Sequence, residues 1–207
     1  PALTTVLPMA GGQVTLLDVG ANADCKPEYL YQFGVMGSMY SERVLGVTQP
    51  RVALLSNGEE PGKGSALVKE AFQLLQDSDL NFVGNVEGKE LIGAEADVVV
   101  TDGFTGNVAI KCIEATARML NDLIRDELMS NPLTILGGLL SKPAFRRVAQ
   151  RTDPFEVGGA PLLGVNGVVI VAHGRSNGRA IRNAIRQARM AVQGDMLNAI
   201  KAGLGTL

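Results

Sequence analysis

The stretch ADVVVTDGFTGN, from Ala96 to Asn107, predicts a buried strand that ends in a small polar turn and continues as a helix. Val98–Val100 is an unbroken β-branched run, which is typical of a strand covered on both faces, as in parallel sheets. The helix is expected to begin near Asn107, because apolar residues then recur at three- and four-residue steps: Ile113, Ala117, Leu120, Ile124 and Leu128. In an open α/β sheet, ligands bind at the carboxyl ends of such strands. The turn is therefore the first candidate for a binding site.

The same order of apolar strand, glycine-bearing polar turn and amphipathic helix occurs four times along the chain. The other three copies begin with VTLLDVGAN at 14–22, RVALLSNG at 51–58 and GVVIVAHGRSN at 167–177, and a weaker strand, LNFVGNV, lies at 80–86. Strands that alternate with helices require right-handed crossovers. The repetition predicts an α/β fold with a mostly parallel sheet flanked by helices, in which all four polar turns lie along one edge.

That geometry would bring several polar side chains to a common crevice. They are Asp18, Asn22, Lys63, Asp102, Thr105, Asn107, His173, Ser176 and Asn177. Each residue type also has a structural role, because Asn and Ser cap helices, Asp stabilises turns and Gly permits left-handed backbone. Ser65 is expected to cap the helix after the second turn, and Pro27 suits the first turn of the helix after the first.

Composition excludes several classes of protein. The chain has 207 residues, a formal net charge of -2 and two cysteines without CxxC spacing, so a nucleic-acid surface, a zinc site and redox chemistry have little support. No apolar run approaches the ~18 residues of a membrane-spanning helix, and the sequence shows no basic-then-apolar signal-peptide pattern, so neither membrane insertion nor secretion is expected. A reducing cytoplasm is the expected compartment. Because the chain begins at Pro1, we expect a fragment or a processed chain.

The glycine-rich segment GEEPGKGS, at 58–65, does not have the spacing of a nucleotide P-loop or of a dinucleotide fingerprint. Neither ATP nor NAD is supported, and no cofactor is expected. A lysine in such a loop at a helix N-terminus can surround an anion with one positive charge and several N–H groups. Lys63, between Gly62 and Gly64, would suit inorganic phosphate or a phosphorylated group. The alternative is a solvated lysine in a flexible loop.

Other chemistries are less well supported by the residues. His173, the only histidine, ends the fourth strand and could act as an acid, a base or a phosphate ligand. One histidine and no GxSxG elbow argue against a serine triad, so Ser176 is interpreted as a helix cap. Cys25 lacks a second histidine to activate it. No metal is expected, because no spacing demands that Glu59, Glu60 and Glu87 bind magnesium.

Residues 119–157 predict a helical hairpin inserted into the α/β region, with an apolar tip between Pro132 and Pro143. The tip residues are Leu133, Ile135, Leu136, Leu139 and Leu140 around a Gly pair, and the cations that follow are Lys142, Arg146, Arg147 and Arg151. Apolar residues followed by positive charge suit contact with an anionic membrane surface or an acidic protein. A dimer contact and packing on the chain's own domain are the alternatives.

The motifs DVGAN, KPE, NGEEPGKG, GNVEG, ADVVVTDGFTGN, GGAPLLG and AHGRSN run in this order across almost the whole chain. The chain closely resembles the PlsX family of bacterial phosphate acyltransferases. That family is similar in fold to phosphotransacetylases and the isocitrate/isopropylmalate dehydrogenases. The resemblance implies an enzyme that moves a long-chain fatty acyl group from acyl carrier protein to inorganic phosphate, giving acyl phosphate for phospholipid biosynthesis.

The resemblance also implies roles for particular residues. Lys63 and Asn107 correspond to the family's activity-critical lysine and asparagine, and the hairpin tip corresponds to its membrane-touching segment. We expect the other site residues to bind substrate: Asn22, Gly62, Gly64, Asp102, Thr105, Gly106, His173, Ser176 and Asn177. A homodimer in the cytoplasm, peripherally associated with the membrane, is implied. The family's N-terminal section has no counterpart here, so residues 1–207 are expected to form the catalytic region of a larger enzyme and to lack part of its cleft.

The chemistry suggested by these turns is direct attack of phosphate on a thioester carbonyl. Lys63 and turn N–H groups would hold the phosphate, and Asn107 would donate to the developing oxyanion, with Asp102 supporting the turn. Two alternatives remain open. One is a phosphotransacetylase-like enzyme that uses acyl coenzyme A, which the apolar insert disfavours. The other is a non-catalytic fragment that serves in dimerisation and membrane docking.

Overall fold

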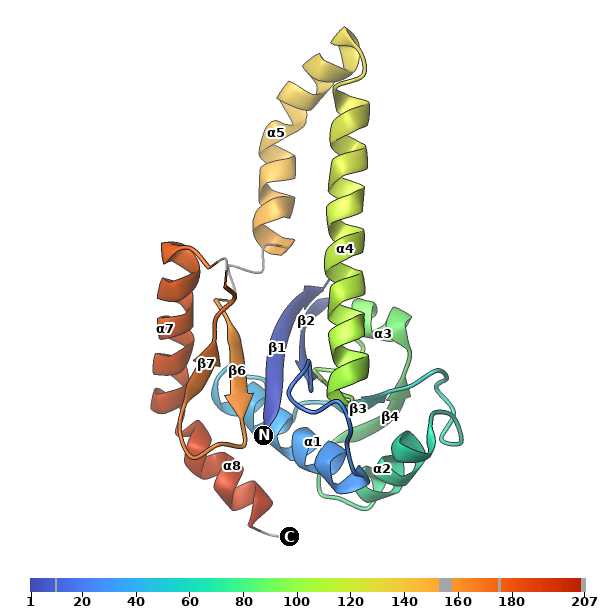
Figure 1. The fold of residues 1–207 in the computed structure, drawn as a ribbon, viewed down its shortest axis with the longest axis vertical. Helices are drawn as coiled ribbons and strands as arrows, with labels where there is room; N and C mark the ends of the chain where they lie inside the picture. The colour runs from blue at the N-terminus through green and yellow to red at the C-terminus, as the bar shows by residue number, and fades with distance from the viewer. Residues whose placement is uncertain (10, 153–157, 175, 206–207) are drawn as a thin grey trace.

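The sheet that the sequence predicts is present in the computed structural model, which describes residues 1–9, 11–152, 158–174 and 176–205 (Figure 1). Seven strands lie in the order β4-β3-β5-β2-β1-β6-β7. Their bounds are β1 Ala2–Met9, β2 Gly12–Leu17, β3 Val52–Leu55, β4 Phe82–Val86, β5 Val98–Val100, β6 Ala160–Leu163 and β7 Val169–Val171. The helices are α1 Pro27–Arg43, α2 Ala66–Gln76, α3 Gly88–Gly93, α4 Gly103–Leu128, α5 Pro132–Thr152, α7 Gly178–Gln193 and α8 Met196–Leu204.

The sheet is mixed. Strands β4, β3, β5 and β2 are parallel neighbours, whereas β1, β6 and β7 each pair antiparallel with the strand beside them. The α/β class is confirmed, but the expectation of a mostly parallel sheet holds only for the part of the sheet formed by β4, β3, β5 and β2. Residues 10–11 separate β1 from β2, and residues 164–168 separate β6 from β7. Because a parallel crossover needs a dozen or more residues, these short links require antiparallel pairs.

The direction of β7 follows from this pairing. Three antiparallel steps lead from β2 through β1 and β6 to β7, so β7 runs opposite to β2, β3 and β5. The carboxyl end of β7 therefore lies at the other edge of the sheet from the first three turns. In Figure 1, α4 leaves the lower edge of the sheet, whereas α7 starts at the upper edge. The prediction that all four turns share one edge is wrong for the fourth turn.

The valine run of β5 is buried on both faces, as predicted. Val98 and Val100 pack on the side covered by α1, α2 and α8, where Tyr40 and Leu54 complete the core. Val99 packs on the opposite side. The side chains at 98, 99 and 100 are 0%, 1% and 0% exposed. Burial of this kind contributes about 25 cal/mol per Å² of apolar surface, which fixes β5 at the centre of the parallel strands.

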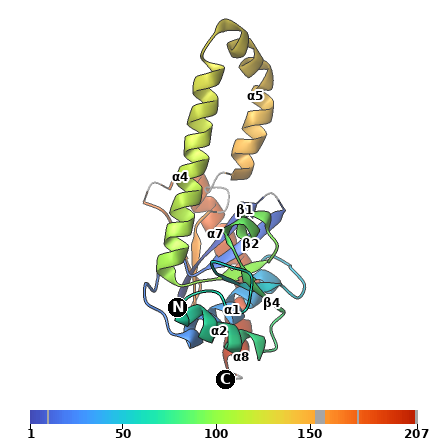
Figure 2. The same cartoon turned by 90° about the vertical axis from the view of Figure 1, so that its right-hand side faces the viewer.

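Helices α4 and α5 form a hairpin that projects from the body, side by side in two perpendicular views (Figures 1 and 2). The predicted apolar stripe of α4 reaches the core only near its start: Ile113 packs on the sheet, whereas Leu120 and Ile124 are 50% and 43% exposed. Pro143 lies inside α5 rather than at a break that ends the apolar tip. Residues 153–157, the end of the predicted insert, lie outside the described residues. Among those described, none of the helices combines the length and hydropathy needed to span a membrane.

Candidate functional site

The turn after β2 is built around the buried carboxylate of Asp18. Its oxygens accept hydrogen bonds from the backbone N–H groups of Leu3, Gly20, Ala21 and Asn22, at 2.9, 3.0, 3.0 and 2.7 Å. The side-chain amide of Asn22 donates to the same carboxylate at 2.8 Å and to the Pro1 carbonyl at 2.7 Å. Because these bonds occupy both carboxylate oxygens, Asp18 organises the turn, and Asn22 is engaged within the protein.

The turn after β5 packs directly against this first turn. The backbone N–H of Gly103 donates to the Asn22 carbonyl at 2.8 Å. A Cβ at Gly103 would lie 2.6 Å from that same carbonyl, and a Cβ at Gly106 would overlap the Asp18 carbonyl. The sequence predicted substrate binding at the second of these two glycines. In the structure, they admit the backbone of the neighbouring turn.

Asp102 and Thr105 hold the start of α4. The Asp102 carboxylate accepts from the Thr105 N–H and from the Thr105 hydroxyl, both at 2.8 Å. This is an N-cap, so α4 begins at Gly103 and not near Asn107 as predicted. Asp102 therefore supports the turn, as the sequence-based mechanism assumed, and Thr105 shares that role.

Asn107 lies in the first turns of α4, where it is exposed to solvent. Its side-chain amide donates to the Val19 carbonyl at 3.1 Å. Gly20 leaves room for this contact, since a Cβ there would lie 3.0 Å from the Asn107 amide nitrogen. The amide is thus oriented by the first turn and remains accessible to a ligand.

The third element of this edge is the loop between β3 and α2. The Lys63 N–H donates to the Glu60 carbonyl at 2.9 Å, and the Gly64 N–H donates to the Asn57 side chain at 2.9 Å. Gly64 has a φ of +98°, a left-handed conformation that other residues rarely adopt. Ser65 caps α2 as predicted, because its hydroxyl accepts from the Val68 N–H at 3.4 Å.

Register places the three turns next to one another. Val100 pairs with Leu54 on one side and with Leu17 on the other, so β3, β5 and β2 end side by side. Lys63 is exposed, and the ion pairs of the described residues do not include its amine. The edge thus presents an available lysine, the start of two helices and the Asn107 amide. Such groups suit an anion and a carbonyl oxygen.

The fourth turn does not join this edge. The Asn177 side chain caps α7 by accepting from the Ala180 N–H at 3.0 Å. The Ser176 N–H donates to the His173 carbonyl at 2.8 Å. Because β7 runs in the opposite direction, His173, Ser176 and Asn177 lie at the far edge of the sheet. Their predicted convergence with Lys63 and Asn107 is wrong.

An acidic cluster lies beside the glycine-rich loop, with Glu59, Glu87 and Glu90 close together. The Lys89 amine lies 3.0 Å from Glu59, 3.5 Å from Glu87 and 3.1 Å from Glu90. The hydrogen bond to Glu59 is the main reason that the pKa of Lys89 is raised. Glu60, which the sequence grouped with Glu59 and Glu87, is not part of the cluster. A single cation of the chain itself, the Lys89 amine, thus already pairs with all three carboxylates.

Cys25 lies behind the first turn. Its thiol donates to the Asn22 carbonyl at 3.6 Å, and burial is the main reason that its pKa is raised. A raised pKa lowers the thiolate fraction at neutral pH, so the environment opposes a nucleophilic role. This agrees with the absence of an activating histidine in the sequence.

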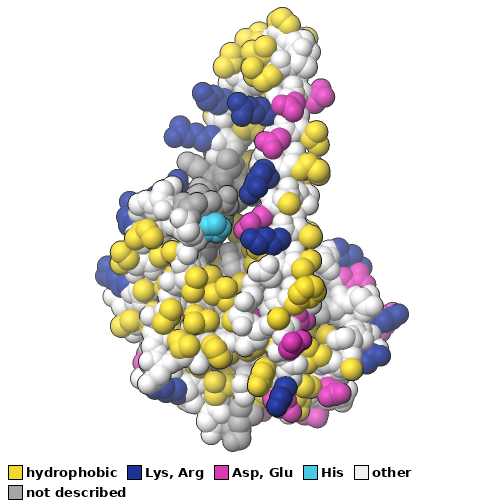
Figure 3. Space-filling model, viewed as in Figure 1, with side chains coloured by type: hydrophobic (Ala, Val, Ile, Leu, Met, Phe, Trp, Pro, Cys, Tyr) yellow, Lys and Arg dark blue, Asp and Glu magenta, His cyan; other side chains and the backbone are white. Residues whose placement is uncertain are grey.

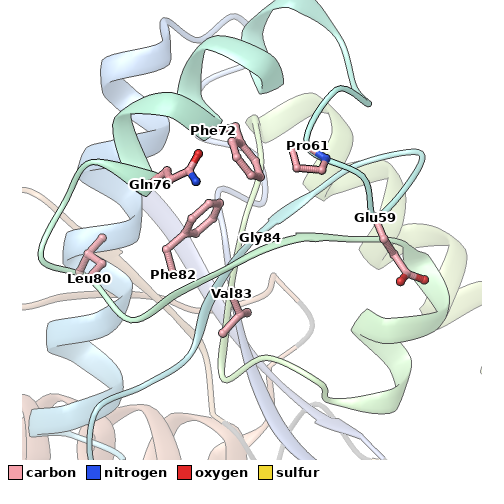
Figure 4. Close-up of a pocket in the computed structure, with 8 residues that line it drawn as sticks. All are labelled: Glu59, Pro61, Phe72, Gln76, Leu80, Phe82, Val83 and Gly84. Carbon is pink, nitrogen blue, oxygen red and sulfur yellow. The ribbon is translucent and has the colours of Figure 1, made fainter.

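A pocket of about 330 Å³ opens between the glycine-rich loop, α2 and β4 (Figure 4). Phe72 and Phe82 meet edge to face in it, with ring centroids 5.1 Å apart. The other lining residues are Glu59, Pro61, Gln76, Leu80, Val83 and Gly84. The sequence did not predict this pocket, because its walls come from three separate segments without a shared motif.

Comparison with known proteins agrees with the sequence motifs. Residues 1–199 match the sequence model of a family described as "Fatty acid synthesis protein". Proteins named phosphate acyltransferase are 51% identical over 201 residues in Elusimicrobium minutum and 50% identical over 201 residues in Heliobacterium modesticaldum. The matches cover 97% of this chain but 59% and 60% of those proteins. The chain thus spans about 60% of the length of these relatives.

The fold is also similar to a solved structure, that of a branched-chain phosphotransacylase from Enterococcus faecalis. The TM-score is 0.54, the sequence identity is 14%, and the likeness covers 93% of this chain and 66% of the other. At this identity the likeness concerns the fold alone. It agrees with the phosphotransacetylase-like fold expected from the sequence.

Proposed function

The chain belongs to the fatty acid synthesis protein family, and from this premise we propose that it transfers a long-chain fatty acyl group from acyl carrier protein to inorganic phosphate. The product, an acyl phosphate, would enter phospholipid biosynthesis. Relatives named phosphate acyltransferase support the reaction class. The observation that carries the proposal is the adjacency of the Lys63 loop and the Asn107 turn at the carboxyl edge of the sheet.

In the proposed site, phosphate binds at the glycine-rich loop. Lys63 supplies a charge that no carboxylate of the described residues neutralises, and the N-terminus of α2 adds the positive end of a helix dipole. Gly62 is exposed with open space around it, so a phosphate can approach the backbone there. Held in this way, the phosphate is oriented for attack on the acyl group. Its reaction with the thioester then occurs between two bound groups instead of through a random encounter in solution.

Asn107 is proposed to act on the acyl group. A phosphate oxygen forms a bond to the thioester carbonyl carbon, the C–S bond breaks, and the thiolate of the carrier leaves and takes up a proton. Negative charge develops on the carbonyl oxygen during this step. The Asn107 amide, already oriented by Val19, donates a hydrogen bond to that oxygen. No covalent enzyme intermediate and no cofactor are required.

The hairpin is proposed to dock on an anionic membrane surface. At its tip, Leu133 and Leu140 are 78% and 77% exposed, and Lys142, Arg146 and Arg147 follow as exposed cations. Figure 3 shows hydrophobic side chains gathered at the end of the hairpin, with positive side chains below them. The side chain of Arg151 lies outside the described residues. We also propose a homodimer, for which the exposed apolar residues Ile185 and Val192 of α7 offer a surface.

A second candidate uses coenzyme A as the acyl carrier, and the phosphotransacetylase-like fold is compatible with either carrier. The exposed apolar tip disfavours it, because a soluble short-chain substrate needs no membrane contact. The test compares long-chain acyl carrier protein with acyl coenzyme A as donors to phosphate in the full-length protein. We expect a higher kcat/KM with the acyl carrier protein. A preference for acyl coenzyme A supports the second candidate, and no turnover with either supports a non-catalytic docking role.

A further inference from the structure

Asn85 is a buried polar residue in β4 that the proposed chemistry does not use. It is 6% exposed and pairs in register with Leu54 of β3. Its side-chain amide donates to the carbonyl of Glu60, 2.9 Å away, across 25 residues of sequence. The bond therefore joins the interior of the sheet to the glycine-rich loop.

The same carbonyl also accepts from Lys63. The Lys63 N–H lies 2.9 Å from the Glu60 oxygen, so one acceptor binds both Asn85 and the backbone of the lysine. Residues 59–63 of the loop are all exposed. A loop without apolar anchors depends on such polar contacts for its conformation, because hydrophobic burial cannot fix it. The hydrogen bond from Asn85 to the Glu60 carbonyl is thus placed to fix the position of the Lys63 backbone.

The remaining atom of the Asn85 amide shows that packing alone does not explain this residue. Its Oδ1 is buried and has no hydrogen-bond partner among the described residues. A buried acceptor without a partner destabilises a fold, whereas an apolar side chain of similar size would not. The hydroxyl of Ser56, beneath Gly64, is buried and unpartnered in the same way. The sheet keeps polar groups under this loop at a cost in stability.

We propose that Asn85 is a positioning residue, which holds the Glu60–Lys63 turn so that Lys63 meets phosphate in a fixed orientation. The inference rests on the proposed function, because it assigns phosphate to this loop. Asn85 touches no reacting atom in this scheme and acts through the Glu60 carbonyl. Loss of its amide donor leaves the lysine present but its loop less ordered, which weakens phosphate binding more than the chemical step.

Asn85→Leu in the full-length protein is the most informative variant, because it removes the donor and the unpartnered oxygen together while keeping a similar volume. We expect the KM for phosphate to rise roughly tenfold, since one hydrogen bond is lost, while the melting temperature does not fall. The KM for the acyl donor should stay unchanged. Asn81→Leu is the control, because Asn81, an exposed residue just before β4, also donates its side-chain amide to a backbone carbonyl, that of Gln49, at 2.9 Å and away from the loop. It should leave the phosphate KM unchanged.

Asn85→Asp provides a second variant of the same shape that cannot donate when ionised, and it should raise the phosphate KM as well. A folded Asn85→Leu protein with the wild-type phosphate KM would overturn the proposal. An equal rise in the phosphate KM for Asn81→Leu and Asn85→Leu would also overturn it, because it would indicate general destabilisation.

Hydrogen exchange separates this inference from the proposed function, because it requires no turnover. In Asn85→Leu, the Lys63 amide should exchange faster, roughly tenfold, while the Ser56 amide, which bonds to Val86 within the sheet, keeps its protection. Unchanged exchange at Lys63 would contradict the positioning role whatever the enzyme does. Faster exchange at Lys63 in a protein that makes no acyl phosphate would support the structural role and contradict the proposed function.

Discussion

The side-chain amide of Asn107 donates to the backbone carbonyl of Val19, 3.1 Å away, and so joins the first turns of α4 to the turn after β2. An amide nitrogen carries two hydrogens, and this contact uses one of them. The second hydrogen is available for a substrate carbonyl, and the Val19 contact fixes the plane in which it lies. A donor oriented before the reaction requires little reorganisation in the transition state.

Asn107→Ala in the full-length protein should lower kcat by roughly 100-fold or more, since it removes one oxyanion donor. The KM for phosphate should change little, because the phosphate is assigned to the Lys63 loop. Steady-state kinetics over a series of phosphate concentrations up to saturation measures both values. Asn177→Ala is the control, because Asn177 caps α7 at the opposite edge and should leave kcat unchanged. Near-normal turnover of Asn107→Ala would remove this residue from the mechanism.

His173→Gln should leave the dependence of the rate on phosphate unchanged. The reason is the reversed direction of β7, which places His173 at the other edge of the sheet from Lys63. Rates measured over a series of phosphate concentrations test this directly. A clear rise in the phosphate KM would show that His173 reaches the phosphate and that the site extends beyond the edge described above.

The parallel part of the fold could be predicted because its signals are local. The Val98–Val100 run, the glycine-bearing turns and the Ser65 cap each lie within a few consecutive residues. Strands β1 and β6 were not predicted, and without them the direction of β7 could not be known. Pairing between distant strands depends on tertiary packing rather than on local pattern.

The candidate site was only partly predictable for the same reason. Lys63 and Asn107 were found because each lies in a turn that follows one of the parallel strands. Asn85 was missed as a site residue, because its partner is the Glu60 carbonyl, 25 residues earlier in the chain. Backbone acceptors carry no signature in a sequence. The glycines of the third turn were recognised in the sequence, but only the structure shows that they let this turn pack against the turn after β2.

Gly106→Ala should destabilise the protein by roughly 1–3 kcal/mol or more, because its Cβ would overlap the Asp18 carbonyl and the two turns would have to separate. Urea unfolding followed by circular dichroism measures the change. Gly167→Ala is the matched control, because its Cβ would meet nothing within 4 Å. If the two variants unfold at the same urea concentration, the close packing of the turns is not a source of stability.

The contact between Arg51 and Asp97 predicts a pH dependence of stability. The Arg51 guanidinium lies 3.0 Å from the carboxylate, and the hydrogen bond between them is the main reason that the pKa of Asp97 is lowered. A lowered folded-state pKa contributes stability above the unfolded value of about 3.9, and this contribution is lost as the pH falls through the folded value.

Asp97→Asn should therefore lower the free energy of unfolding by up to about 1 kcal/mol at neutral pH, in line with a partly exposed pair. The difference from the wild type should shrink below about pH 4. Urea unfolding at the two pH values measures it. Asp79→Asn, at an exposed position, is the control. A deficit of the same size at both pH values would show that the ion pair is not its cause.

The hairpin tip predicts binding to anionic vesicles. Leu136→Asp with Leu139→Asp should reduce flotation with such vesicles at least roughly tenfold, because two exposed leucines can no longer enter the interface. Arg146→Glu with Arg147→Glu should weaken binding by about 1 kcal/mol per residue. Ile92→Asp, on the exposed surface of α3 and outside the hairpin, is the control. Flotation that survives both pairs of changes would contradict docking through the tip.

The central claim is that a phosphate oxygen attacks the carbonyl carbon of the acyl thioester. Its most direct test mixes the full-length protein with long-chain acyl carrier protein and phosphate labelled with oxygen-18, and then measures the label in the acyl phosphate by mass spectrometry. We predict one acyl phosphate for each thioester consumed, with all four oxygens of its phosphate group carrying the label. Loss of the thioester without formation of acyl phosphate would contradict the account. So would an unlabelled oxygen between the acyl carbon and phosphorus, because that oxygen would not have come from the labelled phosphate.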